Sequence, residues 1–103
     1  MMQYRQGDVF LREVPSKPQG LVAEKRQGDI ILALGEVTGH AHRIADKTVL
    51  VWFAAGQRYI EVQEPGATLM HEEHEPIAIA PGLYEVVRQR EWDLSGEVRP
   101  VTD

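Results

Sequence analysis

All four histidines of the chain fall into two short segments, as one His-x-His pair and one His-x-x-His pair. The first pair is His40 and His42, and the second is His71 and His74. Residues two apart on a strand share a face, and residues three apart can converge across a tight turn or a helical turn. Four converging imidazoles would complete a tetrahedral site, whereas three would leave a position open for water or a substrate. We therefore predict that these four histidines bind one divalent transition metal.

Carboxylates near the histidines are candidate substitute ligands and bases. Asp46 or Glu73 is a candidate to replace one histidine, and Glu72 or Glu73 is a candidate general base. In a site with an open position, a metal-bound water would serve hydrolysis or isomerisation. We expect zinc first, with nickel, iron and manganese as alternatives.

A metal-free interpretation competes with this one, because a single histidine is more often a hydrogen-bonded core or surface residue than a ligand. Under that interpretation the protein is an interaction or assembly accessory, and its histidines are structural or face a partner. An open metal position would admit a small-molecule substrate. Apolar edge strands favour a homodimer.

Other site classes lack their residues. The chain has no cysteine, which excludes disulfides, thiolate zinc sites and the zinc deaminase signature. His71 and His74 are three residues apart and not four, so the pair does not match the metalloprotease motif.

The net charge of −5 argues against nucleic acid as a partner. The longest apolar run, residues 49–55, is too short to cross a bilayer, so we expect a cytoplasmic protein without a membrane partner.

The hydrophobic pattern predicts an all-β domain over residues 1–103. No segment shows a sustained helical period, and turn signals recur every eight to twelve residues, as in a small β-barrel or sandwich. We expect residues 91–103 to be a loosely packed tail anchored by Trp92. The predicted strands cover residues 9–14, 30–34, 40–44, 48–53, 58–63, 67–70, 77–80 and 83–90.

A short repeat precedes two of these strands. Arg5-Gln6-Gly7-Asp8 recurs as Arg26-Gln27-Gly28-Asp29, in each case before an apolar strand. It is too short for a repeat architecture, so it indicates reuse of one turn, with the two strands expected as neighbours in a sheet.

Two resemblances follow from these motifs. His40 and His42, then Asp46, then His71 resemble in order the metal ligands of cupins, which implies a metal inside a small β-barrel; Asp46 stands where cupins carry Glu. The whole chain also resembles a family of small, uncharacterised bacterial proteins. The shared motifs are Gly-Glu-Val-Thr-Gly-His-Ala-His at 35–42, His-Glu-Glu-His-x-Pro-Ile at 71–77, Pro-Gly-x-Tyr-x-Val at 81–86 and Gln-Arg-Glu-aromatic at 89–92. That family resemblance implies no particular activity.

Overall fold

The computed structural model describes residues 2–34, 39–88, 90–92 and 98–100, the last two segments by backbone alone. These residues form strands, turns and loops, without a helix. The strands are β1 (Gln3–Gln6), β2 (Val9–Glu13), β3 (Val22–Ala23), β4 (Ile30–Leu34), β5 (Ala41–Ile44), β6 (Leu50–Ala54), β7 (Gln57–Val62), β8 (Ala67–His71), β9 (His74–Ile79), β10 (Gly82–Arg88), β11 (Arg90–Trp92) and β12 (Val98–Pro100). Within the described part of the chain, no helix is long and apolar enough to cross a membrane.

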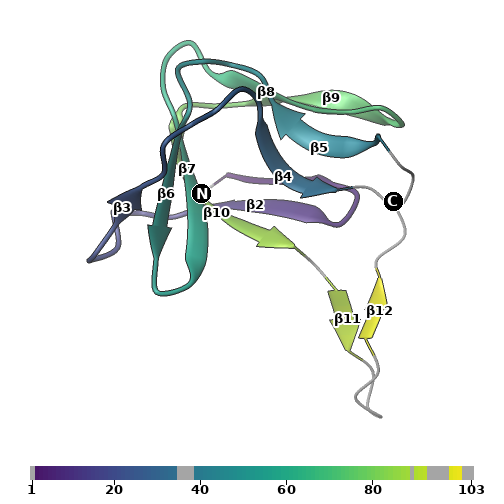
Figure 1. Ribbon diagram of the computed structural model, residues 1–103, viewed down its shortest axis with the longest axis horizontal. Coiled ribbons are helices and arrows are strands. Elements are labelled where there is room, and N and C mark those ends of the chain that lie inside the picture. Colours follow the sequence, from purple (N-terminus) through teal and green to yellow (C-terminus); the bar gives the residue numbers. More distant parts are fainter. Residues whose placement is uncertain (1, 35–38, 89, 93–97, 101–103) are drawn as a thin grey trace.

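Two antiparallel sheets make up the body of the domain (Figure 1). The larger has the strand order β1-β2-β10-β7-β6-β3, and the smaller has the order β4-β5-β8-β9. The strands β11 and β12 form a separate two-stranded ribbon that projects away from the sheets (Figure 1). The fold is therefore all-β, as the hydrophobic pattern predicts.

One hydrophobic core lies between the two sheets. Val9 and Leu11 of β2 are fully buried, and so are Ile44 of β5 and Leu69 of β8. On β8 the buried side chains alternate with half-buried ones, so alternate residues face the core. Because the inner faces of both sheets supply this core, the arrangement is that of a sandwich.

The structure corrects several details of the predicted fold. The described strands do not close into a barrel. The strands that follow the two Arg-Gln-Gly-Asp turns are β2 and β4, which lie in different sheets and are not neighbours. The strands β1, β3 and β12 were absent from the predicted set. The prediction that Trp92 anchors a loose tail concerns side chains outside those described.

Two tyrosines tie the larger sheet to the end of β9. Tyr84 of β10 is fully buried, and its hydroxyl donates a hydrogen bond to the carbonyl oxygen of Ala80 at 2.6 Å. The hydroxyl of Tyr4 accepts a hydrogen bond from the Ala80 amide at 3.0 Å. Burial raises the pKa of Tyr84 well above its ordinary range, and hydrogen bonding to Tyr4 adds to this shift.

Because of this raised pKa, we expect the wild-type protein to lose stability at alkaline pH through Tyr84, and a Tyr84→Phe variant to lack this loss. Above about pH 10 the unfolded chain loses its Tyr84 proton while the folded chain keeps it, so the stability linked to this group is present below that pH and is lost above it. At pH 7 the variant should be about 1 kcal/mol less stable, because it lacks the bond to Ala80. Urea denaturation at pH 7 and pH 11 measures both effects; equal losses of stability between the two pH values in wild type and variant would contradict the assignment.

Candidate metal centre

The β8–β9 hairpin brings His71 and His74 together. His71 ends β8, His74 begins β9, and Glu72 and Glu73 form the two-residue turn between them. The two histidines are directly paired across the hairpin, with ring centroids 4.7 Å apart. Side chains at paired positions lie on the same face of a hairpin. The His-x-x-His spacing is thus explained by a tight turn, not by a helix.

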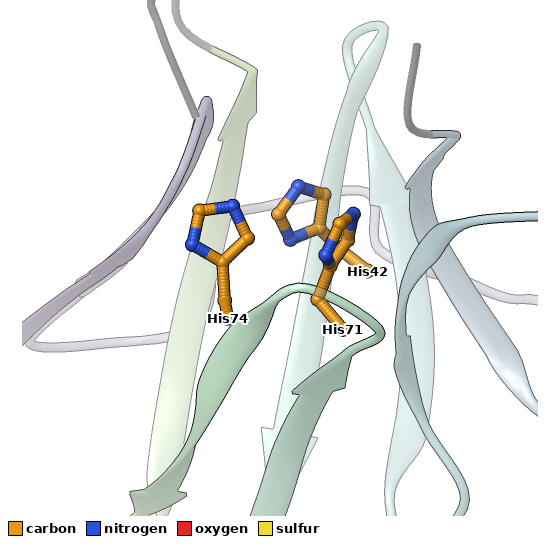
Figure 2. A group of neighbouring side chains, drawn as sticks. All are labelled: His42, His71 and His74. Atoms are coloured by element: carbon orange, nitrogen blue, oxygen red, sulfur yellow. The ribbon is translucent and has the colours of Figure 1, made fainter. Parts of the chain in front are cut away.

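His42 reaches the same place from the neighbouring strand β5. Its side chain is completely buried, and its ring centroid lies 4.3 Å from that of His71 and 5.6 Å from that of His74. One ring nitrogen from each of the three histidines lies within 4.8 Å of the other two. Figure 2 shows the three rings gathered at the hairpin. We call His42, His71 and His74 the three-histidine centre.

His40 borders this centre without belonging to its group, with its ring centroid 5.8 Å from that of His71. It precedes β5, so the prediction that His40 and His42 lie on one regular strand is wrong. Its ligand atom instead groups with those of His71 and Glu72, again within 4.8 Å. The structure therefore brings three of the four predicted histidines into one group and places His40 in a second group that shares His71.

Several ring nitrogens of these histidines are buried without a hydrogen bond from the described residues. These nitrogens include Nε2 of His71 and Nε2 of His74, as well as Nδ1 of His40. Nδ1 of His71 accepts a hydrogen bond from the Glu73 amide at 3.1 Å. Buried polar atoms in folded proteins nearly always have a partner, so these nitrogens stand out among the buried polar atoms of the described residues.

Gln6 at the end of β1 and Asp8 in the turn that follows contact the two ring nitrogens of His42. Neither residue was predicted to take part. Nδ1 of His42 lies 2.9 Å from the side-chain oxygen of Gln6, and Nε2 lies 3.3 Å from a carboxylate oxygen of Asp8. The other carboxylate oxygen of Asp8 lies 3.2 Å from Nε of Arg88. Gln6, His42 and His71 are the buried polar residues of the described chain, so its polar interior is concentrated at this one place.

The predicted carboxylates differ in what they contact. Glu72 accepts hydrogen bonds from the Arg43 guanidinium and the Ala41 amide, which lower its pKa to about 2. The Glu73 carboxylate is mostly exposed and lies 3.7 Å from Nδ1 of His40. The Asp46 carboxylate accepts a hydrogen bond from the Thr68 amide at 2.9 Å and belongs to neither group of candidate ligands.

A family model described as a domain of unknown function, DUF8820, matches residues 5–89. The chain belongs to this family. The segment matched to the DUF8820 domain contains the three-histidine centre together with His40, Gln6 and Asp8. The chain has no match among the curated proteins and none among the solved structures.

Proposed function

We propose that the domain binds one divalent transition metal ion through His42, His71 and His74. The observation that carries this proposal is the convergence of one ring nitrogen from each histidine to within 4.8 Å of the others. Ligand nitrogens about 2.0–2.1 Å from one zinc ion would lie about 3.4 Å apart in tetrahedral geometry, so small side-chain movements would close the centre on an ion. Three protein ligands would leave one position for water or a small molecule.

The charges around the centre favour a cation. The Asp8 carboxylate lies beside Nε2 of His42, and the turn that joins His71 to His74 consists of two glutamates. Such carboxylates would offset the charge of a divalent ion in a partly buried place. Two of these carboxylates also pair with arginines, Glu72 with Arg43 and Asp8 with Arg88.

Metal binding at His71 would involve the Glu72–Glu73 turn. Nδ1 of His71 accepts a hydrogen bond from the Glu73 amide, so a neutral His71 ring carries its proton on Nε2. An ion bound at Nε2 would replace that proton, and Nδ1 would become the protonated nitrogen. The Glu73 amide would then have to turn away from the ring.

A hydrolase or isomerase remains a narrower proposal for the same centre. A carboxylate with a pKa of about 2 is a weak base at neutral pH, so Glu72 is better suited to fixing Arg43 and Ala41 than to accepting a proton. Of the two predicted bases, Glu73 is therefore the stronger candidate. The cupin-like order of the ligands, the small-molecule substrate, the homodimer and the cytoplasmic location stay predictions from the sequence.

A metal-free module is the second candidate, and the contact between Asp8 and His42 favours it. A protonated His42 could donate to Gln6 from Nδ1 and to Asp8 from Nε2, so the buried ring would be satisfied without an ion. The histidines would then be structural, and the protein would act through its surface.

Metal content separates the two candidates. Untagged protein purified without chelator should contain about one transition metal ion per chain by elemental mass spectrometry. Apo protein should take up one equivalent of Co²⁺ and develop the visible absorption of a four-coordinate site. Protein that contains no metal and takes up neither Zn²⁺ nor Co²⁺ would reject the metal centre and leave the metal-free module.

A further inference from the structure

We propose that Gln6 is the positioning residue of the three-histidine centre: its buried amide sets which nitrogen of His42 carries the proton and fixes the hairpin that carries His71 and His74. The part of this inference that concerns metal affinity rests on the proposed function. Its structural part, the state of the His42 ring, can be tested on the protein without any metal.

The orientation of the Gln6 amide follows from its three contacts. Its nitrogen donates hydrogen bonds to the carbonyl oxygens of Leu69 at 3.2 Å and Glu75 at 3.0 Å. The opposite orientation would place the side-chain oxygen against two carbonyl oxygens, which cannot donate. The Gln6 oxygen therefore faces His42 and accepts a hydrogen bond from Nδ1.

This hydrogen bond prepares His42 as a ligand. With the proton held on Nδ1, a neutral His42 has its lone pair on Nε2, the nitrogen beside Asp8. Metal-binding histidines commonly donate the other ring N–H to a fixed acceptor, which sets the tautomer and the ring orientation. Gln6 supplies such an acceptor and is itself only 2% exposed.

The same amide fixes the other two ligands. Leu69 lies on β8, two residues before His71, and Glu75 lies on β9, next to His74. By bonding to both strands, Gln6 of the larger sheet holds the hairpin of the smaller sheet against His42. One side chain thus contacts all three segments that carry the centre.

The chain contains a matched control for this residue. Gln27 occupies the same place as Gln6 in the second Arg-Gln-Gly-Asp turn, and in both turns the arginine Nε donates to the glycine carbonyl, at 3.0 Å in the first and 2.8 Å in the second. Gln27 is exposed, however, whereas Gln6 is buried. A substitution at Gln27 therefore repeats the chemical change in similar turn chemistry away from the histidines.

The test compares wild type, Gln6→Met and Gln27→Met, with Zn²⁺ affinity measured by competition with a chelator. Gln6→Met keeps the side-chain length and removes all three hydrogen bonds, so it should lower the affinity about 10- to 100-fold. Gln27→Met should bind as wild type does. Ile60→Val, which removes a methyl group from a fully buried core residue of β7, should also leave the affinity unchanged and so controls for lost stability.

The ring state is read by ¹⁵N–¹H NMR of the histidine side chains in metal-free protein. We expect His42 to carry a proton on Nδ1 in wild type and to lose this preference in Gln6→Met. If Gln6→Met does not fold, Gln6→Glu takes its place: the carboxylate still accepts from Nδ1 but cannot donate to Leu69 or Glu75, so the Nδ1 proton should persist while the affinity falls.

The outcomes separate the two proposals. A wild-type His42 ring protonated on Nε2 alone would overturn the role of Gln6, and so would wild-type affinity in a folded Gln6→Met variant. Wild-type protein that binds no Zn²⁺ but keeps its His42 proton on Nδ1 through Gln6 would reject the metal centre while the positioning of His42 stands.

Discussion

Replacing His42 with alanine is expected to lower the affinity for Zn²⁺ by at least about 100-fold. Apparent zinc-binding free energies of about 10–16 kcal/mol, shared among four ligands, correspond to roughly 3 kcal/mol for each ligand. His42 is one of three nitrogens within 4.8 Å of one another, so its loss leaves two protein ligands. Chelator competition, or titration with Co²⁺ followed by absorption, measures the change.

His40→Ala is the matched control for this experiment. His40 belongs to the second group, with His71 and Glu72, and His71 belongs to both. If the ion occupies the three-histidine centre, the His42→Ala and His71→Ala variants should lose tight Zn²⁺ binding. The His40→Ala variant should bind Zn²⁺ nearly as tightly as wild type. Loss of tight binding in His40→Ala, with nearly wild-type binding in His42→Ala, would show that the ion occupies the second group. Unchanged stoichiometry and affinity in His42→Ala would show that His42 does not bind the ion and would reject the three-histidine centre.

Removing the metal is expected to lower the melting temperature by roughly 15–30 °C. A ligand that binds only the folded state at a free concentration 1,000 times its Kd stabilises by about 4 kcal/mol, and about 1 kcal/mol moves the midpoint of a domain of this size by roughly 4–8 °C. The comparison is between protein with saturating Zn²⁺ and the same protein with excess chelator, melted by circular dichroism.

The His42→Ala variant provides the control for the chelator itself. It should show a much smaller shift between Zn²⁺ and chelator, because a loss of affinity of about 100-fold removes about 2.7 kcal/mol of the stabilisation by Zn²⁺. A chelator effect of equal size in both proteins would mean that the stabilisation has another origin. His42 is completely buried, so this variant also melts below apo wild type, and only the shift between its two conditions is compared.

The sequence predicted most of the strands, and the approach of His71 to His74, for a local physical reason. Alternating apolar residues and turn signals are read within a few positions, and β4 has the predicted bounds of residues 30–34. His71 and His74 flank a two-residue turn, so their spacing contains the information that they meet. Closure of a barrel depends on contacts between distant strands, which this local pattern does not contain.

The sequence did not reveal Gln6 and Asp8 because their role depends on long-range contacts. In the printed sequence the two Arg-Gln-Gly-Asp turns look alike, and only the fold places the first of them against His42. His40 shows the same limit in the other direction. It shares its motif with His42, yet the chain enters β5 only at Ala41 and separates the two rings into different groups.

The amide of Gln6 joins segments that are far apart in the chain, since its partners include residue 75 as well as residue 42. No short peptide cut from this protein would contain the acceptor for His42 together with the hairpin that carries the other two rings. The metal content of a preparation would then serve as a count of the molecules in which the two sheets have come together correctly. A low metal content after purification would then indicate misassembled protein as well as a weak site.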